Sequence, residues 1–282
     1  MSSMKTIKKR IESLRNTRQI MKAINMSSAS KLQTAKTRLD GARQMLDGAK
    51  HMIENIKNGV DAEGYDFLKE RPVENTAYVI ITSDKGLCGE YNLSISKKVL
   101  AFIDERQNET IISIGLKGSE YLRRYGKTVL RRYSDISESA LYEDAERVAE
   151  LLSVLYTTGE IDEAYIAYTR FETALSHVPD IVRILPIGGD SDDELPNIMM
   201  GFDPDPQTLI EHAAQIYLNA YVYCAMVEAS ACEHASRMMS MDSAANNAGE
   251  LIEGLTREYN RSRQSNITQE INEIVAGATL ND

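Results

Sequence analysis

Hydrophobic residues recur at helical spacing over both ends of the chain. From residue 5 to about residue 57 there is no proline, and the second half of this stretch alternates by three and four residues through Leu32, Ala35, Leu39, Ala42, Leu46, Ala49, Ile53 and Ile56. This is a heptad seam, in which a large side chain alternates with alanine until the last turn. Because alanine lets two helix backbones approach closely, the seam predicts a long helix packed against a partner helix.

The same kind of pattern returns after residue 205. Pro206 occupies the position of a first-turn proline, Asp205 is a candidate N-cap, and no proline follows. Apolar residues then keep helical spacing as far as Ile274, which predicts a helix from about 207 to 276, on the order of 100 Å long. Neither seam is wide enough for its helix to be buried all round, so we expect the two helices to pack on each other.

The centre of the chain has a different pattern. Short apolar runs alternate with amphipathic stretches, which predicts strands at 77–82, 110–114, 128–130, 164–169 and 181–186 and helices at 93–103, 119–125 and 142–156. The predicted fold class is α/β with long helices: an antiparallel coiled coil of N- and C-terminal helices plus a central Rossmann-like, mainly parallel α/β domain. The domain boundaries fall at 1–57, 75–190 and 205–282.

Charge is distributed unevenly along the chain. The net charge is −10 overall, but residues 1–57 carry +9 and residues 208–282 carry −6. A basic first helix and an acidic last helix would attract each other, which favours an intramolecular pair over nucleic-acid binding. No apolar core of a signal peptide follows the basic N-terminus, although its amphipathic, acid-poor character leaves a transit-peptide interpretation open. No run approaches the ~18–20 apolar residues that span a bilayer.

Residue types that carry chemistry are scattered. The three cysteines are odd in number and lack a CxxC motif, which favours reduced, buried thiols over disulfides or a zinc ribbon. The histidines form no metal-binding motif, and the acidic loop at 190–194 lacks EF-hand spacing. We therefore expect no metal, no cofactor and no catalytic residue.

One loop keeps two interpretations open. Residues 83–89, Ser-Asp-Lys-Gly-Leu-Cys-Gly, follow the first predicted strand, where α/β folds bind phosphates, but match neither GxGxxG nor the P-loop. A structural turn that meets a partner is favoured, and nucleotide binding is the alternative. The methionine-rich patch at 237–241 predicts an adaptable surface, against the partner helix or an outside protein.

Three blocks resemble the γ subunits of F-type ATP synthases. They are Asn16–Met26 with Ala29–Leu32, Ser83–Gly89 with Asn92, and Tyr259–Glu270 with Glu273–Ala278. The similarity covers essentially the whole chain, in order. The cysteine-bearing regulatory insert of chloroplast members is missing, so thiol gating is not expected. Asp242, where lysine is common, and Leu280, where a small residue is usual, depart from the family pattern.

The resemblance implies a rotor without a catalytic site of its own. Both terminal helices would enter an α3β3 hexamer, and the α/β domain would stand on a membrane c-ring beside the ε subunit. Ion flow would turn ring and shaft together for ATP synthesis or hydrolysis. The chain would be peripheral, at the cytoplasmic face of the bacterial plasma membrane, bound to the membrane only through the c-ring, and present once per complex without forming a homo-oligomer.

The resemblance also implies contact residues. Positions matching the family's polar contacts to the β subunit are Arg237, Gln264 and Thr268, all expected to face outward, and the segment near its lever region includes Met21, Lys22 and Ile24. Met200 and Phe202 match positions at the c-ring and ε foot. Coiled-coil core is the alternative for Met21 and Ile24, and burial in the domain is the alternative for Met200 and Phe202. Two other functions compete with the rotor: a phosphate-binding α/β protein and a self-associating coiled-coil scaffold.

Overall fold

A computed structural model of the 282-residue chain describes residues 4–58, 64–104, 108–188 and 206–279. The chain divides into two compact units, residues 29–236 and residues 1–28 with 237–282. Five predicted features lie outside the described residues: the candidate N-cap Asp205, the foot residues Met200 and Phe202, the acidic loop at 190–194, and Leu280.

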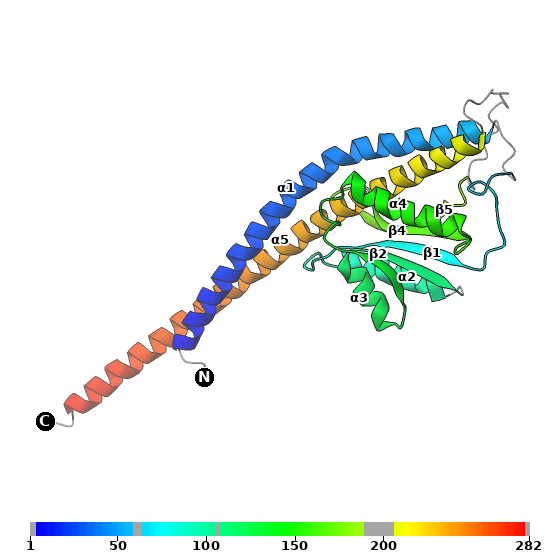
Figure 1. Cartoon of the computed structure of the whole chain (residues 1–282). Coiled ribbons are helices and arrows are strands. Elements are labelled where there is room, and N and C mark those ends of the chain that lie inside the picture. Colours follow the sequence, from blue (N-terminus) through cyan, green and yellow to red (C-terminus); the bar gives the residue numbers. More distant parts are fainter. Residues whose placement is uncertain (1–3, 59–63, 105–107, 189–205, 280–282) are drawn as a thin grey trace. The chain divides into compact units, whose positions relative to one another are not determined.

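The larger unit contains a five-stranded sheet in the order β3-β2-β1-β4-β5 (Figure 1). Neighbouring strands from β3 to β4 are parallel, and β5 runs antiparallel to β4. The prediction of a mainly parallel sheet is therefore confirmed. The strand bounds are β1 Thr76–Ile81, β2 Glu109–Ile114, β3 Val129–Tyr133, β4 Glu163–Phe171 and β5 His177–Leu185.

Helices cover both faces of this sheet. The path from β1 to β2 to β3 moves towards one edge, whereas the crossover from β3 to β4 returns past β1, so right-handed crossovers put its helix on the opposite face. Figure 1 shows α2 and α3 on one face and α4 with part of α5 on the other. The helix bounds are α1 Met4–Lys57, α2 Tyr91–Asp104, α3 Leu116–Arg124, α4 Tyr142–Thr157 and α5 Pro206–Thr279.

The central strand lies in the core of the domain. Every residue of β1 is buried, as predicted from its continuous apolar run. Tyr78 and Ile80 pack with Ile95 and Val99 of α2 and with Leu122 of α3. Strand β1 is thus the packed centre of the α/β domain, and the loop at residues 83–89 follows it.

The two long helices are antiparallel within the larger unit. Arg43 of α1 bonds Glu228 of α5, and seven residues further along α1 the Lys50 ammonium lies 5.6 Å from the ring centre of Tyr221, seven residues earlier on α5. The leucine–alanine ladder of α1 is buried, except that Leu46 is half-buried. The predicted heptad seam therefore forms a coiled-coil contact.

The middle of α5 is more enclosed than the sequence pattern indicated. From residue 217 to residue 235 every residue is buried except Tyr223, which is half-buried. The prediction that neither long helix is buried all round was wrong for this stretch. The reason is that α1 covers one side of α5, while β4 and β5 of the α/β domain cover another.

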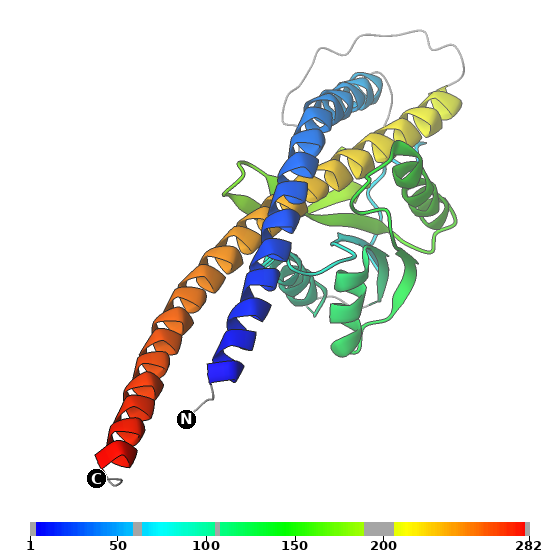
Figure 2. The same cartoon turned by 90° about the vertical axis from the view of Figure 1, so that its left-hand side faces the viewer.

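The smaller unit is a pair of antiparallel helical segments, residues 4–28 of α1 and 237–279 of α5 (Figure 2). Asn25 Nδ2 donates to the Met238 carbonyl at 2.8 Å, and Gly249 lies against the Arg18 guanidinium. Figure 2 shows that α5 continues beyond the first residues of α1. Ile267, Ile271 and Ile274 on this extension are exposed. None of the helices in the described part of the chain has both the length and the hydropathy for a membrane span.

Candidate functional site

The loop after β1 has its polar groups occupied by its own domain. The Ser83 N–H donates to Asn92 Oδ1 at 2.9 Å, and the Ser83 hydroxyl donates to the Lys85 carbonyl at 2.6 Å. Lys85 Nζ pairs with Glu138 at 3.2 Å. These contacts support the favoured interpretation, a structural turn, because the lysine and one backbone donor that a phosphate would need already have protein partners.

The same loop holds a second loop, residues 134–141, which runs between β3 and α4. Asp84 Oδ2 accepts hydrogen bonds from the Asp135 backbone N–H at 3.0 Å and from the Ser137 hydroxyl at 2.9 Å. Glu138 in turn accepts from both Lys85 of the first loop and Lys31 of α1, the latter at 2.6 Å. The β1 loop is therefore linked to α1 through Glu138.

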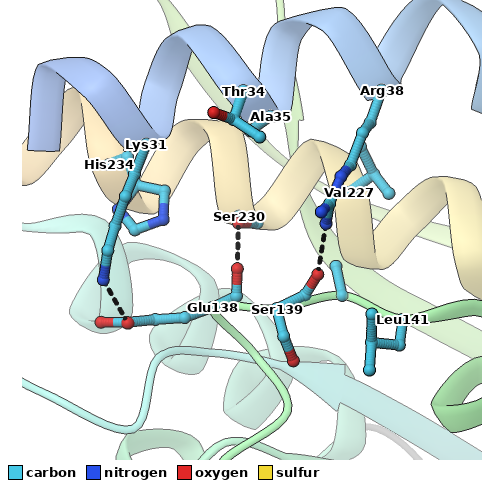
Figure 3. A pocket seen from close by; sticks show the side chains of 11 residues that line it. Lys31, Thr34, Ala35, Arg38, Glu138, Ser139, Leu141, Val227, Ser230 and His234 are labelled. Atoms are coloured by element: carbon cyan, nitrogen blue, oxygen red, sulfur yellow. Dashed lines mark hydrogen bonds and ion pairs between the residues drawn. The ribbon is translucent and has the colours of Figure 1, made fainter.

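Loop 134–141 also lies against both long helices (Figure 3). Arg38 of α1 donates to the Ser139 carbonyl at 2.7 Å, and Ser230 of α5 donates to the Glu138 carbonyl at 3.2 Å. A cavity of about 280 Å³ lies between the loop and the helices, lined also by Thr34 and His234. The arrangement binds loop 134–141 of the α/β domain to both long helices.

Electrostatics favours the charged form of Glu138. Burial raises the pKa of this carboxyl, but the hydrogen bonds and charges of Lys31 and Lys85 outweigh it and lower the pKa from 4.5 to about 2. Glu138 is therefore ionised at neutral pH. Two ammonium groups from different elements converge on a single carboxylate.

A second ion pair lies between the long helices and the end of β4. Arg43 Nε donates to Glu228 Oε1 at 2.8 Å, and Arg43 Nη2 donates to the Phe171 carbonyl at 2.8 Å. Burial lowers the pKa of Arg43, but the Glu228 carboxylate outweighs it and raises the pKa above its ordinary value. Together with Glu138, this pair fastens the α/β domain to both long helices.

The residues expected to contact a β subunit occupy different environments. Gln264 and Thr268 are exposed on successive turns of α5, and the Thr268 hydroxyl donates to the Gln264 carbonyl at 3.0 Å. Arg237, in contrast, is only 7% exposed, so the expectation that it faces outward was wrong. The reason is that Arg237 lies where α5 is still packed, whereas Gln264 and Thr268 lie near its exposed end.

The expected contact segment of α1 lies in the smaller unit. Lys22 is exposed, whereas Met21 and Ile24 are half-buried, which agrees with the coiled-coil alternative for both apolar residues. Asn25 of the same segment bonds the Met238 carbonyl, so this part of α1 lies beside the methionine-rich patch that begins at Arg237. The structure therefore places this segment of α1 beside the start of the methionine-rich patch, whereas Gln264 and Thr268 lie further along α5.

Comparison with known proteins shows the family. A family model described as ATP synthase matches residues 3–279. The ATP synthase gamma chain of Alkaliphilus metalliredigens is 34% identical over 281 residues, 98% of this chain and 97% of that protein. The gamma chain of Lachnoclostridium phytofermentans is 34% identical over 287 residues, 99% of each chain. The chain belongs to the ATP synthase γ-chain family.

Solved structures show the same fold. A chain of the Euglena gracilis mitochondrial ATP synthase, from a structure of OSCP, F1 and c-ring, superposes with a TM-score of 0.74 at 21% identity, covering 98% of this chain and 93% of that one. A chain of the Tetrahymena thermophila central stalk and c-ring structure gives 0.64 at 27% identity, covering 80% and 99%. The Euglena gracilis chain shows that the fold is the same. The Tetrahymena thermophila chain, which is more similar in sequence, comes from a structure of the central stalk and c-ring.

Sequence reasoning missed the residues that fasten the γ-chain domain to its long helices. Arg43, Glu138 and Glu228 were not singled out. A signal existed for Glu228, since it is a lone carboxylate within the apolar run from Ala225 to Ala229. A buried charge in such a run needs a partner, and that requirement predicts a cation nearby. Glu138 gave no comparable signal, because it lies in a polar loop.

Among the described residues, no group of three or more His, Cys, Asp or Glu side chains could hold a metal ion.

Proposed function

We propose that this γ chain is the rotor of an ion-translocating ATP synthase, coupling rotation of a c-ring to conformational change at the catalytic β subunits. The observation that carries the proposal is the near-full-length similarity to ATP synthase gamma chains, in a molecule whose sheet domain is fastened to two paired long helices. Long helices can carry a mechanical displacement, and the fastened domain offers a place where rotation can be applied.

The proposed mechanism is a shift in the populations of the conformations of the catalytic subunits. Each conformation of a catalytic subunit has its own contact free energy with the shaft, so a turn of an asymmetric shaft favours a different conformation at each of three sites. The chain itself needs no catalytic group, since its contribution is the difference in contact free energy between orientations. Two unequal helices have an asymmetric cross-section, which such a mechanism requires.

The partners of the proposed rotor are an α3β3 hexamer around the helices and a c-ring with ε at the foot. Gln264 and Thr268 would meet a β-subunit loop, because both are exposed and can donate and accept hydrogen bonds. Lys22 would meet the β lever region, with Met21 and Ile24 contributing their half-buried side chains. Arg237 would support this surface from within.

Met200 and Phe202 remain proposed contacts with the c-ring and ε. The chain would be present once per complex, at the cytoplasmic face of a bacterial plasma membrane, attached through the c-ring. One rotor per hexamer follows from the mechanism, since a single asymmetric shaft gives three sites three different states at once.

Reconstitution tests the proposed function. The purified chain alone should hydrolyse no ATP, and adding it to α and β subunits should produce ATP hydrolysis that depends on the chain. Absence of any dependence on the chain, in a mixture where α and β subunits assemble, would refute the rotor assignment. A stable homodimer in sedimentation, with no binding to α and β subunits, would favour a coiled-coil scaffold instead.

A further inference from the structure

Strand β4 ends at Phe171, and both backbone groups of this residue are bound by the long helices. The Phe171 N–H donates to Glu228 Oε2 of α5 at 3.3 Å, while the Phe171 carbonyl accepts from Arg43 Nη2 of α1 at 2.8 Å. Arg43 and Glu228 also bind each other. A single ion pair therefore joins three elements, α1, α5 and β4, at one point.

The surrounding part of α5 carries further contacts to the domain backbone. Ser230 donates to the Glu138 carbonyl at 3.2 Å, and the Cys232 thiol donates to the Thr169 carbonyl at 3.3 Å. With Glu228, three side chains in little more than one helical turn bind the backbone of the α/β domain. The contact at Glu228 also includes Arg43 of α1, so both helices and strand β4 are fixed to one another here.

The energetics of the Arg43–Glu228 pair favour a role in fixing the register of the two helices over a role in stabilising the fold. The Glu228 side chain is 5% exposed and that of Arg43 is 43% exposed. Removing charges from water offsets much of their attraction, so a buried pair contributes little net stability, but it can fix one register among several apolar alternatives. The next heptad, where Lys50 lies over Tyr221, repeats the same register. A one-residue slip of α1 along α5 would lose both contacts.

We propose that Arg43 and Glu228 are the positioning pair that makes the α/β domain and the two long helices turn as one body. This inference rests on the proposed rotor function. The hydrophobic effect is non-directional, whereas the guanidinium fork and the carboxylate hold their partners in defined directions. Torque applied to the sheet domain would pass through Phe171 into both helices at once.

Three variants separate this role from simple stabilisation. The double variant Arg43→Met with Glu228→Leu removes both charges together, so no unpaired charge is left, but the Phe171 N–H loses its acceptor. Arg43→Lys keeps the charge but replaces the fork by one ammonium, which cannot reproduce the paired geometry at both Glu228 and the Phe171 carbonyl. Glu120→Gln is the control, because it breaks an ion pair with Lys117 that is confined to α3.

Each variant would be assembled with all the other subunits of the same ATP synthase in sealed vesicles. ATP hydrolysis, ATP-driven ion uptake and the melting temperature of the chain would be measured on the same preparations. We expect Arg43→Lys and the double variant to hydrolyse ATP but to take up fewer ions per ATP, with the double variant affected more. Glu120→Gln should match the wild type in all three measurements.

Unchanged ion uptake per ATP in both Arg43→Lys and the double variant would overturn the proposal. If the double variant fails to fold, Arg43→Lys alone decides the question, because it retains the charge and nearly all of the packing. Failure of the wild-type chain to support hydrolysis would overturn the rotor function itself. Normal wild-type coupling with unaffected variants would overturn only the role of the pair.

Discussion

Gly115 lies directly against the backbone of Thr82: a Cβ atom added to Gly115 would come within 2.0 Å of the Thr82 carbonyl oxygen. Gly115 has a φ of 88° at the end of β2, and its N–H donates to the Tyr133 carbonyl at 2.8 Å. The ends of β1, β2 and β3 therefore converge on a position with no room for a side chain. The loops that fasten the domain to the long helices start at these strand ends.

We expect Gly115→Ala to destabilise the α/β domain by about 3 kcal/mol or more, because it combines an unfavourable φ with a backbone clash. Gly126→Ala is the matched control, since Gly126 has a similar φ of 80° but no atom within 4 Å of an added Cβ. The control should lose only about 1 kcal/mol, the conformational cost alone. Denaturant unfolding of both variants would measure this, and equal losses would contradict the proposed clash.

We expect Glu138 to make a pH-dependent contribution to the stability of the folded chain. Its pKa is lowered from 4.5 to about 2, so the folded chain binds its proton less readily than the unfolded chain does. The resulting stability is fully present above the unfolded pKa of about 4.5 and is lost as the pH falls through about 2. Glu138→Gln should therefore cost about 1 kcal/mol at pH 7, a modest value because Glu138 is partly exposed.

The test compares unfolding of Glu138→Gln with the wild type at pH 7 and at successively lower pH. The difference should shrink between about pH 4 and pH 2. Glu120→Gln, which removes a half-buried ion pair within α3, should differ little from the wild type throughout this range. A Glu138→Gln difference that stays constant with pH would show that the lysine contacts of Glu138 do not set its protonation.

The long helices were the easiest part of the fold to predict. A strict heptad seam and the absence of proline leave few alternatives, so α1 ends at Lys57 as expected and α5 begins at Pro206. The strands were predicted with small errors at their ends. For example, β5 begins at His177, whereas residue 181 was predicted, because Pro179 at a sheet edge disguises the strand.

Burial of charged residues could not be predicted from periodicity. Glu233 and His234 in the stretch from residue 217 to 235 suggest a solvated face, yet both are buried because α1 and the sheet enclose the helix. A single sequence contains no direct information on which segments pack on the far side of a helix. The interhelical and loop contacts of Arg43 and Glu138 depend on that packing, and the seam alone could not reveal them.

The three cysteine thiols should be unreactive in the folded chain. All are free and buried, in agreement with the expectation from their number and spacing. Burial, with the nearby Glu228 carboxylate, raises the pKa of Cys224 to about 12, and the same causes raise that of Cys232. Because the thiolate is the reactive form, neither residue should react appreciably at pH 8.

A thiol reagent such as DTNB provides the measurement. We expect slow labelling of the native chain and rapid labelling of three thiols in denaturant. The variant Leu87→Cys is the positive control, since Leu87 is 63% exposed next to buried Cys88. It should add a single fast-reacting thiol. Rapid labelling of the unmodified native chain would mean that the packing around α5 opens readily.

Arg237 and the pair Gln264 and Thr268 should behave differently when each is replaced by alanine. Arg237 is 7% exposed, so Arg237→Ala removes a packed side chain and should cost roughly 1–3 kcal/mol. This differs from the sequence-based expectation that Arg237 faces outward. Gln264→Ala and Thr268→Ala alter exposed positions and should change stability by no more than about 0.5 kcal/mol.

Two measurements on the same variants separate the roles. Hydrogen exchange of the helical pair formed by residues 4–28 and 237–279 should show faster opening for Arg237→Ala only. Chain-dependent ATP hydrolysis with α and β subunits should fall for Gln264→Ala and Thr268→Ala despite unchanged exchange, if these residues contact a β subunit as proposed. Slower hydrolysis in Arg237→Ala without faster exchange would instead make Arg237 a direct contact, which its burial argues against.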